Sequence, residues 1–231
     1  MKASRGDPLP AASIRFSPLV HLPAGRVTGF AACFSAAGPS DRELHAACRT
    51  AAHWPDGFVL GVELKRAQWR EPATGLRVLS ALGKSGLAPG RLELGIAALA
   101  PARDLAIVGK VIDELRRFGI RVALTDCGGS ASATMPAFEV DKIALAPHLV
   151  GRLGRDPQSE RTAGAFLDLA VEHGVTAGAA GIATGTQFDM LRSMGCAEGL
   201  GALFGAAMPA YDIPALLRIP GLADLPNEAV A

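Results

Sequence analysis

The stretch that decides the fold is residues 91–127, RLELGIAALAPARDLAIVGKVIDELRRFGIRVALTDC. Its two ends, 91–97 and 121–127, are short apolar runs with the length and branched side chains typical of buried β-strands. Between them, apolar residues recur every three to four positions over 104–118, as in an amphipathic helix. Strand, helix and strand in this order predict two parallel strands joined by a crossover helix.

The same alternation continues on both sides of this unit. Ser40 followed by Glu43 predicts a capping box, and therefore a helix that begins there and ends near Trp54. Further strands are predicted at 58–64, 142–147, 175–181 and 199–205, and further helices at 73–84, 131–138, 160–173, 184–194 and 213–218. This alternation favours a mostly parallel sheet with helices as crossovers.

Residues 14–35 do not follow this alternation of strands and helices. Strands are predicted at 14–21 and 26–35 around a turn at 22–25, which makes an antiparallel hairpin. Eight strands at this spacing in 231 residues indicate one α/β domain, a modified TIM-type (β/α)8 barrel with an antiparallel opening hairpin. We expect an N-terminal extension at 1–13, the barrel at 14–219 and a C-terminal tail at 220–231.

Composition excludes several classes of function. The 23 basic and 22 acidic residues leave a net charge of +1, which argues against a nucleic-acid polymer or an anionic membrane as partner. No apolar run approaches the roughly 18 residues of a membrane span, and Asp7, Pro8 and Pro10 interrupt the start of the chain where a signal peptide needs an apolar core. We expect a cytoplasmic protein without contact to a membrane.

The four cysteines form no CxxC pair, which favours free thiols in a reducing compartment. His45 and Cys48 share one helical face, and Cys33 could approach them to make three zinc ligands. Ordinary packing is the competing interpretation, and we favour it because no fourth ligand has motif spacing. No metal and no cofactor are predicted.

In a barrel of this kind, the active site lies at the C-terminal ends of the strands. Only Glu63 and Asp126 place a carboxylate at the expected height. Metal-assisted hydrolysis of a phosphodiester usually requires several carboxylates, so two are too few. A serine triad is also disfavoured, because His21 is the one histidine at a predicted strand end. We therefore assign no catalytic residue.

Gly128, Gly129 and Ser130 follow a strand and precede a predicted helix. Backbone amides in such a turn can hold a phosphate, but the stretch lacks the lysine and the spacing of a P-loop. An ordinary turn between strand and helix explains the same glycines. Both interpretations remain open at this point.

Several segments resemble the EAL-type cyclic-di-GMP phosphodiesterase domain, in the right order over residues 14–213. FSPLVHLPAGRVTGFAAC at 16–33 resembles the family pattern FQPIVDLxTGxIVGFEAL, and FGIRVALTDCGGSAS at 118–132 resembles LGVRLALDDFGTGYSS. The segments at 91–98, 139–150, 173–196 and 199–210 resemble RLELEITES, PVDYLKIDRSFV, the AEGVE region and AQGYLFGRPMPA. The resemblance implies an EAL-like barrel.

The same resemblance implies a degenerate site. The signature Glu falls on Ala31, and the metal-binding Asn and Glu of the next two strands fall on Glu63 and Gly95. The first of the paired aspartates falls on Thr125, and the second is kept as Asp126. The remaining family positions hold apolar residues: the catalytic Lys falls on Ala144, the following Asp on Ala146, the Glu of AEGVE on Ala180 and the Gln of QGY on Leu200.

The losses lead us to expect a catalytically inactive EAL-like protein that binds a regulatory protein partner in bacterial signalling. The partner is unnamed, and self-association is a further option because EAL-like barrels often pair. A receptor that binds cyclic-di-GMP without cutting it is the alternative, with Ser17, Glu63, Asp126, Gly128 and Gly129 as residual ligand-binding residues. In that receptor, Ser17 and Ser35 would stand where relatives have a Gln and a phosphate-facing Arg. The third hypothesis is a weak cyclic-di-GMP phosphodiesterase.

Overall fold

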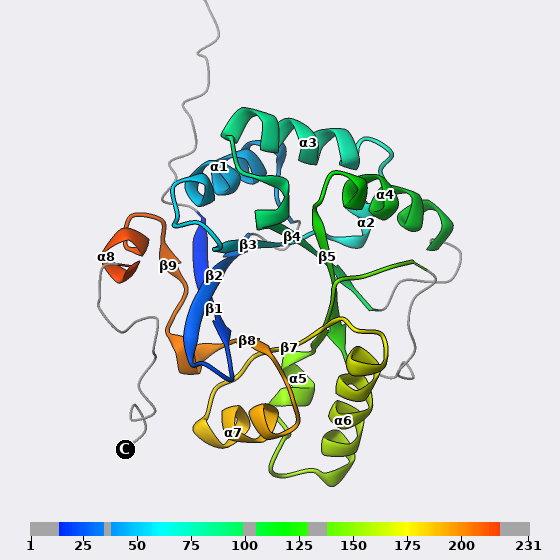
Figure 1. Cartoon of the computed structure of the whole chain (residues 1–231), viewed down its shortest axis with the longest axis vertical. Helices are drawn as coiled ribbons and strands as arrows, with labels where there is room; N and C mark the ends of the chain where they lie inside the picture. Colours follow the sequence, from blue (N-terminus) through cyan, green and yellow to red (C-terminus); the bar gives the residue numbers. More distant parts are fainter. Residues whose placement is uncertain (1–13, 35–37, 99–104, 129–137, 218–231) are drawn as a thin grey trace, which may run out of the picture.

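The wall of the molecule is a closed barrel of strands, which Figure 1 shows from one end. The structure is a computed structural model that describes residues 14–34, 38–98, 105–128 and 138–217. Within these residues, the barrel strands are β1 (Arg15–His21), β2 (Arg26–Cys33), β3 (Val59–Glu63), β4 (Leu92–Ala97), β5 (Arg121–Cys127), β6 (Lys142–Leu145), β7 (Thr176–Ala180) and β8 (Glu198–Leu200).

Consecutive strands are neighbours around this wall. From β2 to β8 each strand runs parallel to the next, and β1 is antiparallel to both β2 and β8, which closes the barrel. A short additional strand, β9 (Met208–Pro209), pairs with the start of β1. The predicted barrel and its opening hairpin are therefore confirmed.

Helices surround the barrel on the outside, as Figure 1 shows. They are α1 (Asp41–Ala52), α2 (Arg66–Trp69), α3 (Thr74–Ser85), α4 (Leu105–Arg117), α5 (Pro147–Val150), α6 (Pro157–Glu172), α7 (Gly185–Ser193) and α8 (Ile213–Leu217), with 3-10 turns at Pro89–Arg91 and Ala202–Phe204. None of the helices in the described ranges is both long and apolar enough to cross a bilayer.

In the helix α4, the apolar residues that recur every three to four positions are mostly buried. Val111, Ile112 and Leu115 are buried against the strands, together with Val108. Ile107, which lies on the same predicted face, is 46% exposed. The apolar stripe is thus core from Val108 to Leu115, and Ile107 lies at its edge.

Capping residues decide where two helices begin. Ser40 Oγ accepts from the Glu43 amide at 3.3 Å, and the Glu43 carboxylate accepts from the Ser40 amide at 2.9 Å, so the predicted capping box is present. The helix α6 begins at Pro157 instead of Glu160, because Asp156 caps it and proline is favoured in the first turn.

Further differences from the prediction concern the last barrel strand and three short elements. The last barrel strand ends at Leu200, because residues 202–204 turn into a 3-10 helix that packs Phe204 on Phe188 with ring centroids 6.1 Å apart. The short helices α2 and α5 and the strand β9 were not predicted, since elements of two to four residues carry too little periodicity. The helix predicted at 131–138, the extension 1–13 and the tail from 220 fall outside the described residues, apart from Phe138.

Candidate functional site

The interior of the barrel contains a cavity of about 220 Å³. A barrel of eight strands is normally filled by layers of bulky branched side chains from the strands. Here small residues line the cavity on every strand from β2 to β7: Ala31, Ala32, Gly61, Gly95, Ala123, Ala144, Gly178, Ala179 and Ala180. The interior is hollow because these positions carry at most a methyl group.

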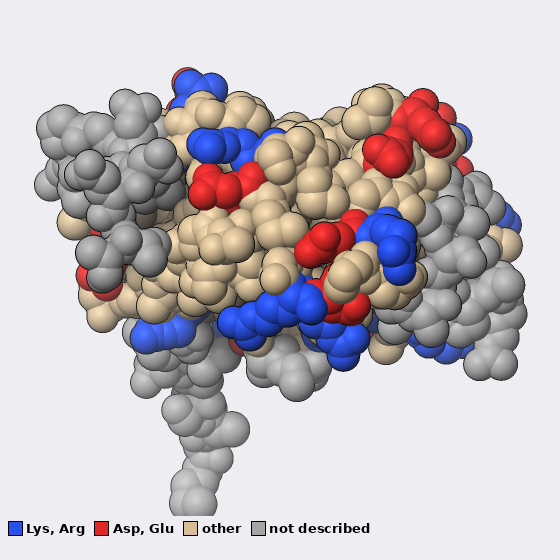
Figure 2. All heavy atoms as spheres, turned by 90° about the horizontal axis from the view of Figure 1, so that it is seen from below, with Lys and Arg blue, Asp and Glu red and all other residues tan. Residues whose placement is uncertain are grey.

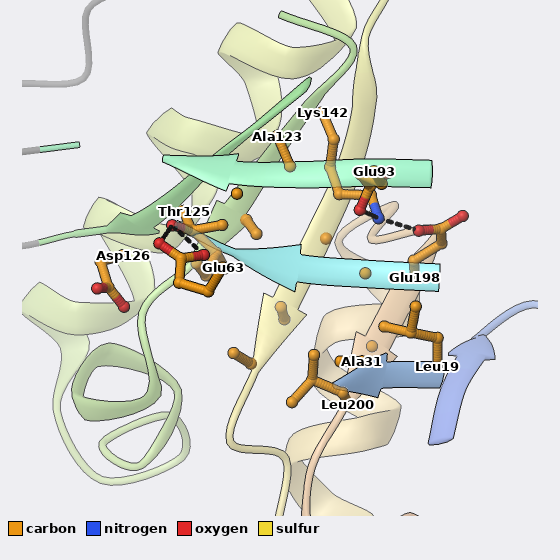
Figure 3. Close-up of a pocket in the computed structure, with 18 of the residues that line it drawn as sticks. Leu19, Ala31, Glu63, Glu93, Ala123, Thr125, Asp126, Lys142, Glu198 and Leu200 are labelled. Carbon is orange, nitrogen blue, oxygen red and sulfur yellow. Dashed lines mark hydrogen bonds and ion pairs between the residues drawn. The ribbon is translucent and has the colours of Figure 1, made fainter. Parts of the chain in front are cut away.

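The floor of the cavity, at the N-terminal ends of the strands, is ionic (Figure 3). Lys142 at the start of β6 forms ion pairs with Glu93 of β4 and with Glu198 of β8, and Arg121 lies 3.2 Å from the second oxygen of Glu93. Burial alone would lower the pKa of Lys142, but the two carboxylates raise it above its usual range. The lysine is therefore charged and is held by both acids.

The mouth of the cavity, at the opposite end in Figure 3, carries Glu63, Thr125 and Asp126. The Thr125 hydroxyl donates to the Glu63 carboxyl, with oxygen distances of 3.0 and 3.1 Å. Burial raises the pKa of Glu63 to about 7, and the charge of Asp126 adds to this rise, while the Thr125 bond and Lys65 oppose it. Near neutral pH, Glu63 is therefore divided between its protonated and charged forms.

The Glu63 carboxyl occupies the space above Gly95. A Cβ atom at position 95 would lie 2.0 Å from Glu63 Oε2 and 3.1 Å from the methyl group of Thr125. Glu63 and Gly95 are direct neighbours in the register of β3 and β4. The long acidic side chain on one strand and the missing side chain on the next are thus complementary in shape.

Asp126 lies in an irregular part of β5. Its φ of 55° is in the left-handed region, and the pairing of β5 with β6 shifts register between Leu124 and Cys127. Aspartate tolerates this conformation better than most residues with a Cβ. The irregularity leaves the Asp126 side chain exposed at the rim.

Among the predicted ligand-binding residues that the structure describes, Glu63 and Asp126 lie in the cavity wall, whereas Ser17 and Gly128 do not. Ser17 pairs with Ala31 across the hairpin, lies outside the lining, and has its Oγ 3.6 Å from Cys33 Sγ. Gly128 has a φ of 112° and packs against Leu149, while Gly129, Ser130 and Ser35 lie outside the described residues.

The pattern of the EAL domain family matches residues 40–207, most of the barrel. This chain belongs to the EAL domain family. The match begins after the opening hairpin, yet β1 of that hairpin closes the EAL barrel by pairing with β8. The resemblance seen in the sequence is therefore confirmed.

Known proteins similar to this EAL domain include signalling proteins. An uncharacterized signaling protein of Caulobacter vibrioides is 32% identical over 174 residues, 73% of this chain. A cyclic di-GMP phosphodiesterase of Pseudomonas aeruginosa is 29% identical over 129 residues, 55% of this chain. The matched region covers 21% and 22% of these two proteins, so the chain spans about a fifth of their length.

The fold of the EAL domain also has solved counterparts. The structure of the PaMucR phosphodiesterase in complex with c-di-GMP covers 87% of this chain, and this chain covers 93% of it. The two agree with a TM-score of 0.78 at 20% sequence identity. At this identity, the likeness concerns the fold.

A divalent metal ion does not fit the residues at the mouth. Magnesium and manganese require several oxygen ligands at once, usually from carboxylates. In the described part of this EAL domain, no group of three or more His, Cys, Asp or Glu side chains could hold a metal ion. The zinc ligands suggested by the sequence, Cys33, His45 and Cys48, do not form such a group either. Cys48 is buried in the core, whereas Cys33 is exposed on β2.

The ionic floor was not predicted from the sequence. Glu93, Lys142 and Glu198 each stand at or next to the start of a short apolar strand, which was a usable signal. A charged residue that alternates with buried residues in a barrel strand points inward. The partner of each charge could not be inferred, because the ion pairs join strands far apart in the sequence.

Proposed function

We propose that this EAL domain is catalytically inactive and acts as a regulatory module that binds a protein partner in cyclic-di-GMP signalling. The observation that carries the proposal is the mouth of the barrel, where Ala31, Gly95 and Thr125 stand at positions that the sequence resemblance assigns to metal ligands of the family. Glu63 and Asp126 are the carboxylates in the cavity wall at this end. Two carboxylates, one of them largely buried, supply too few ligands for a two-metal centre.

Binding to a protein fits the surface better than binding to a polyanion. Figure 2 shows small groups of opposite charge next to one another, separated by wide uncharged areas. Leu76 and Val171 are more than 70% exposed on α3 and α6, as is Tyr211. The proposal places the protein in the cytoplasm, in keeping with its four free thiols.

A hydrolysis assay tests the inactive state. The purified chain is incubated with cyclic-di-GMP and either Mg²⁺ or Mn²⁺, and the linear dinucleotide is measured. We expect no product above the buffer control. Turnover that disappears in the Asp126→Ala variant, but persists in Asp189→Asn on the outer helix α7, would contradict the proposal.

Affinity capture from the native cell tests the partner. We expect a protein recovered in fixed stoichiometry with the chain, and light scattering would show whether two copies also pair. Repeated recovery of the chain alone would count against a regulatory module. The bound protein would then be titrated against the purified chain to measure its affinity directly.

The alternative function is a receptor for cyclic-di-GMP without hydrolysis. It is favoured by the fold shared with the PaMucR phosphodiesterase, whose structure contains c-di-GMP. Calorimetry with cyclic-di-GMP, with and without Mg²⁺ or Ca²⁺, separates the two functions. Heat of binding in the micromolar range favours the receptor, and no heat favours the protein-binding module.

A further inference from the structure

The hollow interior of the barrel has a size suited to a small molecule. A cavity of about 150 Å³ lined by apolar side chains can hold one benzene ring, and this cavity is about 220 Å³. Pockets for larger, drug-sized ligands start at about 300 Å³. The space inside the barrel therefore fits a single ring or a short aliphatic chain with a head group, and it is too small for a dinucleotide.

The walls and ends of the cavity determine which chemistry it accepts. Its middle is lined by methyl groups and backbone, with Leu19 and Leu200 completing the wall in Figure 3. Among the described residues of the lining, the acids are Glu63, Glu93, Asp126 and Glu198, and the one base is Lys142. This lysine is already bound by Glu93 and Glu198. The interior therefore attracts positive charge and repels phosphate or carboxylate groups.

The two ends of the cavity are not equivalent for a ligand. At the floor, Lys142 neutralises part of the charge of Glu93 and Glu198, and Arg121 adds to this. At the mouth, Asp126 is exposed, and the hydrogen bonds of the Glu63 carboxyl come from a neutral hydroxyl. A cationic head group is therefore attracted more strongly to the mouth than to the floor.

We propose that the barrel interior binds a small organic cation, an amine or amidine whose apolar body lies between the strands and whose head group meets Glu63 and Asp126. The glycine and alanine positions that remove bulk from the barrel make room for the body. Asp126 and the charged form of Glu63, which a bound cation favours, supply charge-assisted hydrogen bonds to the head. The site differs from a metal centre, since no bound ion is required.

Three probes of the same shape test this assignment: benzamidine, benzyl alcohol and benzoate. Titration of the full chain by calorimetry should show binding of benzamidine in the high micromolar to millimolar range, weaker binding of the alcohol and none of benzoate. Equal affinity for benzamidine and benzoate would overturn the proposal. So would the absence of benzamidine binding at millimolar concentrations.

Variants locate the probe. Glu63→Gln combined with Asp126→Asn keeps the shape of the mouth and removes its charge, so benzamidine affinity should fall by about tenfold or more. Ala144→Leu places a larger side chain in the cavity and should abolish benzamidine binding, while Asp189→Asn on the exterior should leave it unchanged. Unaltered binding in both the mouth variant and the Ala144→Leu variant would show that the probe lies elsewhere.

A measurement on the unaltered chain tests the same assignment without relying on the folding of any variant. With alanine methyl groups labelled, benzamidine ring protons should show nuclear Overhauser contacts to Ala123, Ala144 and Ala180 inside the barrel. Contacts to surface alanines only would refute the assignment. The result is independent of the proposed function, because neither hydrolysis nor a protein partner enters the measurement.

Discussion

At the scale of the residue, Glu63 should make stability depend on pH. Its pKa is about 7 in the folded chain, against an ordinary value of 4.5. Between these values the folded chain binds more protons than the unfolded chain, so stability falls as pH rises from about 4.5 to about 7. The total loss is on the order of 3 kcal/mol, at about 1.4 kcal/mol for each pKa unit.

Glu63→Gln tests this dependence, because glutamine keeps an oxygen that can accept the Thr125 bond and carries no charge. Urea unfolding should give similar free energies for both proteins at pH 5 and a more stable variant at pH 7.5. Every other titratable group is the same in both proteins, so the difference between the two pH profiles reports the charge at position 63, including its interaction with Asp126 and Lys65. Parallel pH profiles for the two proteins would show that Glu63 does not titrate as stated.

Gly95 should be coupled energetically to Glu63. A Cβ atom in Gly95→Ala would lie 2.0 Å from Glu63 Oε2, so the carboxyl must leave its position and its bond to Thr125. The carboxyl is the end of a flexible side chain, so the expected cost is that of the lost hydrogen bond, about 1 kcal/mol. In a Glu63→Ala background, the same change should be neutral or stabilising, since alanine restricts the unfolded chain more than glycine.

A double-mutant cycle from urea unfolding measures this coupling. We expect an interaction free energy of at least about 1 kcal/mol between positions 63 and 95. Additive costs would mean that the Glu63 side chain does not occupy the space above Gly95.

At the scale of the element, the helix α1 depends on its capping box. Ser40→Ala removes the acceptor for the Glu43 amide and should destabilise the protein by about 1 kcal/mol. Thr162→Ala in α6 is a matched control, because that hydroxyl bonds to a carbonyl one turn earlier and its loss is nearly neutral. Thermal unfolding of the two variants checks the difference, and equal midpoints would contradict it.

At the scale of the whole molecule, Lys142 ties three strands together inside the barrel. Lys142→Met would leave the partly buried Glu198 without its cation and buried Glu93 with Arg121 alone, at a cost of about 3 to 5 kcal/mol. Adding Glu93→Gln and Glu198→Gln to the same chain should recover most of that loss. Chemical denaturation followed by circular dichroism measures both effects, and a cost below about 1 kcal/mol for Lys142→Met would refute this role.

The fold was largely predictable because its signals are local. Apolar residues at 91–97 and 121–127 repeat within one strand, and those of α4 repeat within one helix, so neighbours in sequence carry the pattern. The Ser40 capping box spans four residues and was found for the same reason. Half of the candidate site, Glu63 and Asp126, was predictable because carboxylates at strand ends face the mouth of a barrel.

The sequence by itself determined the barrel, its opening hairpin and the scarcity of acids at the strand ends. Only the tertiary structure decided that Glu63 lies over Gly95, that Lys142 binds Glu93 and Glu198, and that small residues leave a cavity between them. The physical reason is distance along the chain. Lys142 and Glu93 are 49 residues apart, and the closure and register of the strands bring their side chains together.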